Sequence, residues 1–209
     1  MIKKELIKER VFTVFFMVAV TFVAITLVGI VDIVTAESVQ RNRGLFLRQA
    51  VADAFGATAH PNVQALLDWY DTAVTEVRDP DGHPDHFWIQ NEDGEQSLVL
   101  VYRGSGLWGG ITAFVGFESD GQTIRGVNFQ DHVETPGLGA RIDELWFRNQ
   151  FVGKSGPFAR PQPEPQDKTL LSDDGQTFHQ VTGATITSTS VREIMNRSLE
   201  RAAALVSAR

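Results

Sequence analysis

The sequence predicts an α+β protein: one N-terminal transmembrane helix, followed by a domain in which helices pack on a twisted antiparallel sheet. Three observations predict this class. Residues 11–31 carry no charge, three stretches have apolar residues at helical spacing, and four short apolar segments are joined in pairs by turn sequences. After one anchor, roughly 165–175 residues remain, which suits a single domain.

Composition narrows the function classes before any motif is considered. The formal net charge is −7, and no cluster of Lys and Arg follows the first ten residues. This argues against a nucleic-acid partner, because phosphate contacts need such clusters. The chain has no Cys, which excludes disulfides, iron–sulfur ligation and cysteine nucleophiles. A redox role would therefore need an organic cofactor, or His and carboxylate ligands.

The uncharged run of residues 11–31 is 21 residues long. A helix of about 20 apolar residues spans the bilayer hydrocarbon, so the run predicts an uncleaved anchor. A cleaved signal peptide is the alternative, but its apolar core is usually about 7–15 residues, and Val34-Thr35-Ala36 is a weak cleavage site. We expect residues 1–36 to form the cytoplasmic N-terminus and the anchor, and residues 37–209 to form the folded domain.

Basic residues on the two sides of the anchor indicate its orientation. Four stand closely before the run, Lys3, Lys4, Lys8 and Arg10, whereas three stand further beyond it, Arg41, Arg43 and Arg48. The positive-inside rule then favours a cytoplasmic N-terminus. The domain is expected on the periplasmic, extracytoplasmic side of the inner (cytoplasmic) membrane, which the chain crosses once.

Two helices and a loop are predicted at the start of the domain. The spacing of apolar residues indicates a helix over residues 38–56, ended by Gly56, and a second helix that begins at Pro61 and is closed by Asp79-Pro80. Residues 79–86 hold two His and three Asp, but also two Pro that make the spacing irregular. We interpret them as a solvated loop rather than a metal site.

Four strands are predicted next, in two hairpins. Residues 87–90 and 98–102 meet across the turn sequence 91–95, and residues 111–118 and 123–129 meet across Ser119-Asp120-Gly121-Gln122. Four prolines indicate a surface loop over residues 153–168. In the terminal helix, Ser190 and Glu193 would form a capping box, and the apolar face would comprise Val191, Ile194, Met195, Leu199, Ala202 and Val206.

Residues 182–190 stand out because six of the nine carry a hydroxyl group, immediately before the terminal helix. Unpaired N–H groups and the helix dipole make a helix N-terminus suited to anions, and Gly183 and Ala184 let the main chain approach a bulky phosphate. An ordinary N-cap is the alternative, although one cap needs only one hydroxyl. The residues alone leave a phosphate site and a capped helix both open.

Three ordered blocks resemble a known family. Residues 182–188, T-G-A-T-I-T-S, resemble the (S/T)-G-A-T-x-T-S flavinylation motif of FMN-binding domains. These domains occur in the C subunit of the Na+-translocating NADH:quinone reductase and the G subunit of the Rnf ferredoxin:NAD+ reductase. Residues 132–139, H-V-E-T-P-G-L-G, resemble the E-T-P-G-L-G segment of both subunits. Residues 104–109, G-S-G-L-W-G, are similar to the G-x-G-L-W stretch of the quinone-reductase subunit and less like the Rnf version.

The resemblance implies a cofactor and its contacts. In the family the second Thr of the motif, here Thr185, is joined through its oxygen to the phosphate of FMN by a separate flavin transferase, which leaves the isoalloxazine ring free. The other cofactor-binding residues that the resemblance implies are Thr182, Gly183, Ala184, Thr187, Ser188, Glu134, Thr135, Leu138, Gly139, Leu107 and Trp108. No catalytic residue is expected.

Some of these residues could instead have a purely structural role. The segment around Pro136-Gly137 could simply be a tight connection between a strand and a helix, and Trp108 an ordinary core residue. For His132, next to Asp131, a surface position is the simpler interpretation than proton transfer. The family motif usually has Asp three residues before its first Thr, and this chain has His179 there. Either the transferase tolerates His, or flavinylation is inefficient or absent.

Three function hypotheses follow. The first is an electron-carrier subunit of an ion-translocating NADH:quinone or ferredoxin:NAD oxidoreductase complex, with multi-span membrane subunits as partners, because one span without a charge cannot conduct ions alone. The second is a stand-alone anchored FMN protein that feeds an extracytoplasmic reductase. The third is a family member that has lost flavin and acts as a binding module.

Overall fold

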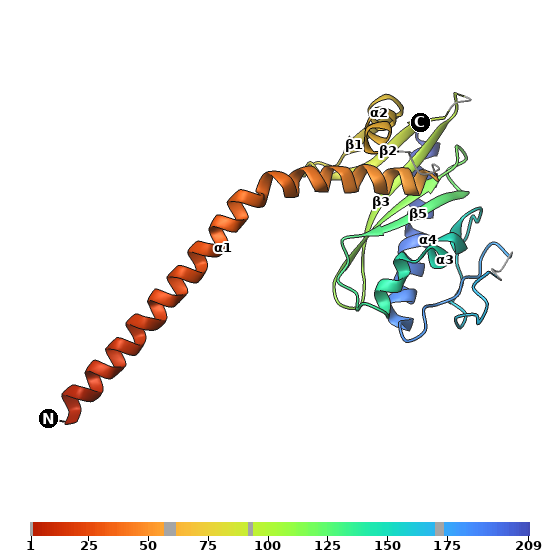
Figure 1. Cartoon of the computed structure of the whole chain (residues 1–209). Coiled ribbons are helices and arrows are strands. Elements are labelled where there is room, and N and C mark those ends of the chain that lie inside the picture. The colour runs from red at the N-terminus through yellow and green to blue at the C-terminus, as the bar shows by residue number, and fades with distance from the viewer. Residues whose placement is uncertain (1, 57–61, 92–93, 170–173) are drawn as a thin grey trace. The chain divides into compact units, whose positions relative to one another are not determined.

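Helix α1 (Ile2–Phe55) is the first element of the computed structural model, which describes residues 2–56, 62–91, 94–169 and 174–209 (Figure 1). The chain divides into two units, Met1–Phe46 and Leu47–Arg209. Among the described residues, α1 is the one helix long and apolar enough to cross a membrane, within Lys8–Phe55. Its apolar side chains between Val11 and Val34 are exposed. The predicted N-terminal apolar helix is confirmed, and so is the helix end at Gly56, which has φ +73°.

Five antiparallel strands form one sheet in the order β1-β2-β3-β4-β5, so each strand pairs with its neighbours along the chain. The strands are β1 (Val74–Arg78), β2 (Pro84–Gln90), β3 (Gln96–Ser105), β4 (Gly110–Phe117) and β5 (Ile124–Gln130). The four predicted strands are confirmed as β2 to β5 with shifted bounds. Gly121 has φ +65° in the turn between β4 and β5, as the Asp-Gly signal predicts.

The second predicted helix is wrong in its C-terminal part. Helix α2 (Val63–Ala73) follows the N-cap Asn62, whose side chain accepts a hydrogen bond from the Ala65 N–H at 2.9 Å. The predicted start, Pro61, lies outside the described residues. Val74 and Val77, predicted to be helical, belong to β1 and pair with β2. β-Branched residues favour strands, and here cross-strand pairing outweighs helical spacing.

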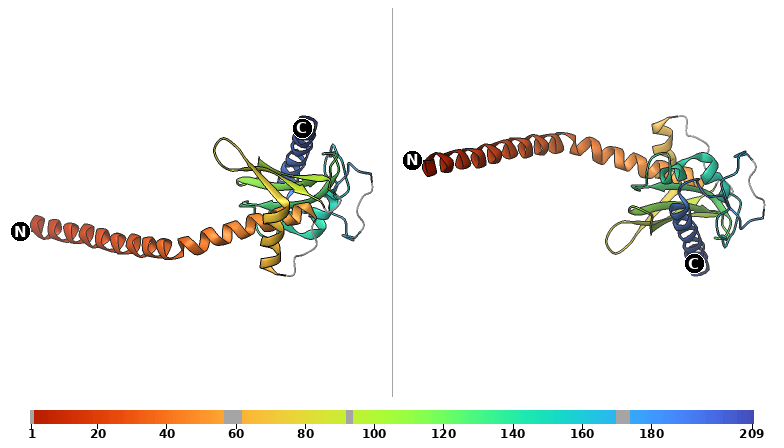
Figure 2. Two further views of the ribbon diagram at one scale, coloured as in Figure 1. Left: turned by 90° about the horizontal axis from the view of Figure 1, so that it is seen from above. Right: turned by 90° about the horizontal axis from the view of Figure 1, so that it is seen from below.

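The two faces of the sheet have separate cores. On one face, Leu98 and Leu100 of β3 pack in a cluster with helix α4 (Thr185–Ser207) and the short helices η1 (Gly139–Asp143), α3 (Leu145–Arg148) and η2 (Asn149–Phe151). On the other face, Val99 and Val101 pack with the end of α1 and with α2. Figure 2 shows α4 and the end of α1 on opposite sides of the sheet.

The last turn of α1 lies directly on the sheet. A Cβ added to Gly116 would stand 1.9 Å from the Ala54 carbonyl oxygen, and one added to Gly126 would stand 2.6 Å from it. Glycine at both positions therefore lets a helix main chain contact a sheet main chain.

The start of the terminal helix differs from the prediction. Helix α4 begins at Thr185 rather than after Ser190, and Glu193 pairs with Arg197 at 3.1 Å instead of completing a capping box. Hydroxyl side chains disfavour helices when they compete for main-chain groups, but those of Thr187 and Ser188 in the first turn have defined partners here. The predicted apolar face is confirmed: Val191, Ile194, Met195 and Ala202 are buried, and Leu199 and Val206 are partly buried.

The proline-rich residues 153–168 are irregular, as predicted, but they do not lie wholly on the surface. Phe158 is buried, and its ring packs against those of Phe151 and Phe178. Lys154 is also buried and donates to the Thr177 carbonyl. The segment therefore closes one edge of the core and brings Glu164 to the hydroxyl-rich segment.

Candidate functional site

The hydroxyl-rich segment forms the N-terminus of α4. Gly183 has φ +77°, Ala184 is the N-cap, and Thr185 is the first helical residue. The first N–H groups of a helix have no acceptor within the helix, and Ala184 offers none from its side chain. The start of α4 is thus not the ordinary side-chain N-cap that was the alternative for this segment, and it keeps N–H groups for an anion.

The structure divides the hydroxyl groups of this segment into engaged and free ones. Thr187 is buried and donates to Glu134, and the buried Ser188 accepts a hydrogen bond from the Val181 N–H at 3.1 Å. Thr185 is exposed, and its hydroxyl has no partner within the described residues. A free hydroxyl at the first position of an uncapped helix is suited to carry a phosphoryl group.

Glu134 joins the three sequence blocks. Its Oε1 accepts hydrogen bonds from the N–H groups of Leu107 at 2.7 Å and Trp108 at 3.2 Å, and its Oε2 accepts the hydroxyl of Thr187 at 2.6 Å. The residue is 5% exposed. Segments that lie far apart in the sequence therefore meet at one buried carboxylate.

Two glycines make this junction close-fitting. A Cβ on Gly106 would stand 2.4 Å from Oε1 of Glu134, and a Cβ on Gly139 would stand 2.6 Å from Oε2. Both distances are shorter than real Cβ contacts. The atoms nearest to Gly139 belong to Glu134 and Thr187. The absence of a side chain at Gly139 therefore lets the main chain of this turn lie against the Glu134 carboxylate.

Four exposed apolar side chains accompany the junction. They are Leu107 at 44%, Trp108 at 68%, Leu138 at 43% and Ile186 at 59% exposure, and together they are termed the apolar shelf. Leu138 contacts the start of α4, because a Cβ on Gly183 would stand 2.9 Å from its Cδ2. Trp108 is therefore exposed, and the alternative that it is an ordinary core residue is wrong. Exposed apolar side chains on three segments that meet at Glu134 indicate a candidate interaction site.

The segment around Pro136-Gly137 is a tight connection next to the junction at Glu134. Gly137 has φ +75°, and the carbonyl of the exposed Thr135 accepts the N–H groups of Leu138 and Ala140, both at 3.1 Å. This turn leads from the end of β5 into η1. It holds the Leu138 side chain against Gly183.

Sequence reasoning missed Glu164 and Arg141. Glu164 accepts the Thr182 N–H at 2.6 Å and the Arg141 guanidinium at 2.7 Å. The hydrogen bond from Arg141, followed by those from Thr182, lowers the pKa of Glu164 to about 2, and Glu164 raises the pKa of Arg141 in turn. Glu164 therefore joins the hydroxyl-rich segment to η1. It stands between two prolines of an irregular stretch, where no sequence pattern indicates a functional residue.

His179, at the position where the family motif has Asp, is held by main-chain and ring contacts. Its N–H donates to Gln150 Oε1 at 2.7 Å, and its carbonyl accepts Gln150 Nε2 at 3.1 Å. The ring Nδ1 lies 2.8 Å from the Pro163 carbonyl. His179 therefore supports the proline-rich segment next to Glu164.

His132 differs from the surface residue that was expected. Its side chain is 10% exposed, and its Nε2 lies 2.9 Å from Oδ2 of Asp143. The hydrogen bond with Asp143, with smaller contributions from Glu134 and Asp131, raises the pKa of His132. The pair connects the segment after β5 to the end of η1.

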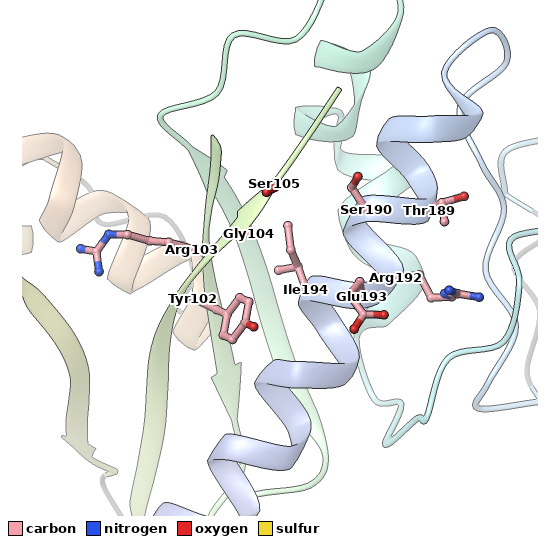
Figure 3. Close-up of a pocket in the computed structure, with 9 residues that line it drawn as sticks. All are labelled: Tyr102, Arg103, Gly104, Ser105, Thr189, Ser190, Arg192, Glu193 and Ile194. Atoms are coloured by element: carbon pink, nitrogen blue, oxygen red, sulfur yellow. The ribbon is translucent and has the colours of Figure 1, made fainter. Parts of the chain in front are cut away.

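A cavity of about 530 Å³ opens between the end of β3 and α4. Figure 3 shows Ser105 of β3 and Ser190 of α4 on opposite sides of it, with Ile194 close to Gly104 and with Arg103 turned away. Thr189, one helical turn after Thr185, also lines it. The volume is in the range of small-molecule sites. Its polar lining includes hydroxyl residues and the charged residues Arg192 and Glu193.

These features define a class: an α+β domain with an exposed threonine hydroxyl at a helix N-terminus and an apolar N-terminal helix. Residues 106–200 match the family model of the FMN-binding domain. The chain is 30% identical to the G subunit of the ion-translocating oxidoreductase complex of Vibrio cholerae over 176 residues, which cover 83% of this chain and 81% of that protein. The chain belongs to the FMN-binding domain family that includes this G subunit and the C subunit of the Na+-translocating NADH-quinone reductase.

A second relative is the C subunit of the Na+-translocating NADH-quinone reductase of Yersinia pestis, 37% identical over 115 residues. These residues cover 52% of this chain and 42% of that protein, so the match spans less than half of the relative. The predicted family resemblance is confirmed.

Solved structures show the same fold. The C subunit of the Na+-translocating NADH-quinone reductase from Parabacteroides distasonis superposes with a TM-score of 0.59 at 25% identity, over 77% of this chain and 90% of that chain. The NqrC of Shewanella oneidensis superposes with a TM-score of 0.64 at 19% identity, over 78% of this chain and 97% of that chain. The predicted fold class is confirmed.

Proposed function

We propose that the chain binds FMN through a phosphoester to Thr185 Oγ1 and carries electrons as a membrane-anchored subunit of an ion-translocating oxidoreductase complex. The observation that carries this proposal is the exposed Thr185 hydroxyl, which has no partner within the described residues and stands at the first position of α4. An ester there puts the remaining phosphate charge at a helix N-terminus, where N–H groups and the dipole stabilise it.

The residues around Thr185 fit such a group. Ala184 adds no side-chain cap, so N–H groups of the first turn remain for the phosphate. The apolar shelf offers Leu107, Trp108, Leu138 and Ile186 to a flat aromatic ring, and the cavity beside Ser105 and Ser190 offers space and hydroxyl groups. We assign Thr182, Gly183 and Thr135 to the rim of the site, and Thr187, Ser188, Glu134 and Gly139 to its support.

The chemistry divides between cofactor, chain and maturation enzyme. FMN supplies reversible electron transfer when bound. The residues of this chain tether the cofactor and orient it. For the tether, Thr185 Oγ1 loses its proton and bonds to phosphorus, while the leaving group of a phosphoanhydride-activated flavin departs. We assign this step to a separate flavin transferase.

Location and partners belong to the same proposal. We assign residues 1–36 to a cytoplasmic N-terminus and single inner-membrane span, and residues 37–209 to an extracytoplasmic FMN-binding domain. Support comes from the exposed apolar length of α1 and the basic residues before it. The relatives named above are subunits of complexes. We therefore propose multi-span membrane subunits as partners.

The test uses the full-length chain produced with a flavin transferase. Denatured wild-type chain should show yellow-green fluorescence in a gel, and Thr185→Val should show none. The matched control is Thr75→Val, which changes an exposed threonine on β1 and should remain fluorescent. A wild-type chain with neither fluorescence nor visible flavin absorbance would overturn the proposal and favour a flavin-free binding module. Flavin on a chain that co-purifies with no membrane subunit would favour the stand-alone protein.

A further inference from the structure

We infer that Glu134 is a positioning residue: its buried carboxylate fixes the hairpin tip of Leu107 and Trp108 to the start of α4 and puts a negative charge beside the cofactor site. The positioning stands on the geometry alone. Only the effect of the charge on the cofactor rests on the proposed function.

The hydrogen-bond partners of Glu134 within the described residues are all donors. Two main-chain N–H groups point to Oε1 and one hydroxyl points to Oε2. These three donors surround a carboxylate that is 5% exposed, so the hydrogen bonds replace its contacts with water. No salt bridge to Glu134 exists in the described parts of the chain, and His132, two residues earlier, is bonded to Asp143 instead.

The hairpin tip depends on this carboxylate. Gly106 donates its N–H to the Gly109 carbonyl at 2.6 Å and closes the hairpin between β3 and β4. Beyond this bond, Leu107 and Trp108 direct their N–H groups to Glu134, while their side chains are exposed. Without Glu134, the tip would lose both bonds that hold it to the rest of the site.

The carboxylate has no room to move away. The main chain at Gly106 stands against Oε1 and that at Gly139 against Oε2. Thr187 Oγ1 joins the second oxygen from α4, within the first turn of the helix. The main-chain hydrogen bonds that hold Leu107 and Trp108 to the first turn of α4 therefore pass through one side chain.

The charge has its own consequence for a redox cofactor. A fixed negative charge in a poorly solvated place opposes the addition of electrons to a ring bound next to it. Glu134 therefore lowers the midpoint potential of a flavin seated on the apolar shelf. Glu134→Gln separates the two roles, because the amide oxygen still accepts the two N–H groups but carries no charge.

The first experiment needs no flavin. Full-length Thr185→Val protein is treated with chymotrypsin, and cleavage after Leu107 and Trp108 is compared with cleavage after the buried Phe147, which reports global unfolding. Glu134→Ala should raise the ratio of cleavage at the hairpin tip to cleavage after Phe147 about tenfold. This factor corresponds to a loss of about 1.4 kcal/mol in the free energy that holds the tip to the domain. Glu134→Gln should stay near the parent. The control, Glu118→Ala, changes a half-exposed carboxylate that follows the other end of β4 and should leave the ratio unchanged. An unchanged ratio in Glu134→Ala would overturn the positioning.

The second experiment is a redox titration of the flavinylated full-length chain. In the fraction of each variant that carries FMN, Glu134→Gln should shift the midpoint potential upward, and Glu118→Gln should not. A shift no larger than that of Glu118→Gln overturns the electrostatic role. A wild-type chain without flavin contradicts the proposed function and with it the electrostatic role, while the proteolysis ratio still decides the positioning.

Discussion

The hydroxyl of Thr187 donates a 2.6 Å hydrogen bond to Oε2 of Glu134, which lies 53 positions earlier in the sequence. Both residues are buried. This bond joins the first turn of α4 to the turn that precedes η1. Two threonines of one short motif thus have different tasks: Thr187 holds the site together, and Thr185 faces solvent as the proposed acceptor.

Thr187→Val should destabilise the protein. Valine has a similar shape but no donor, so a buried carboxylate oxygen loses its partner, which typically costs about 1–3 kcal/mol. Chemical denaturation of the full-length chain in detergent should show this decrease in the free energy of unfolding. Thr75→Val, on exposed β1 surface, should change it by less than about 0.5 kcal/mol. Equal values for the two variants would contradict the assigned bond.

Gly106→Ala should weaken the site, because its Cβ would stand 2.4 Å from Glu134 Oε1 and 2.9 Å from Ile111 Cδ1. Overpacking of this kind costs about 1–3 kcal/mol. Gly110→Ala is the matched control, since its nearest new contact is an ordinary 3.8 Å. Thermal melting should separate the two variants. Equally stable variants would show that the hairpin has room the structure does not indicate.

The Glu164–Arg141 contact should make stability depend on acid. The pKa of Glu164 is about 2 in the folded chain against an ordinary 4.5, so the folded state favours the ionised form. This contribution is complete above about pH 4.5 and is lost as the pH falls towards 2. Glu164→Gln should therefore melt lower than wild type at pH 6, and by a smaller margin at pH 3. A margin that does not change with pH would contradict the assignment.

The parts of the fold that could be predicted from the sequence are those that depend on patterns of neighbouring residues. The apolar length of α1, the Gly-containing turns between strands and the apolar face of α4 all depend on neighbouring residues, and the structure confirms them. Strand β1 was mistaken for helix because Val74 and Val77 fit both periods, and only pairing with β2 decides between them. The contacts of Glu134 and Glu164 reach 18 to 53 positions along the chain, and no local pattern encodes such distances.

The orientation can be tested because the chain has no Cys. Ser119→Cys, in the exposed turn after β4, should react with a membrane-impermeant maleimide added to intact cells, and Lys3→Cys should react only after lysis. The mass of the purified chain should include residues 1–36, since the anchor is proposed to be uncleaved. Labelling of Lys3→Cys from outside would reverse the orientation, and a chain beginning after Ala36 would mean a signal peptide.

Peptide mapping by mass spectrometry tests the central proposal most directly. Trypsin cleaves after Lys168 and Arg192, so Thr185 lies within residues 169–192. In chain produced with a flavin transferase, this peptide should carry the mass of FMN less one water, with fragment ions that place it on Thr185. Thr185→Val should give the unmodified peptide. An unmodified wild-type peptide, or FMN on Thr182, Thr187 or Ser188 instead, would contradict the assignment of Thr185 as the flavin attachment site.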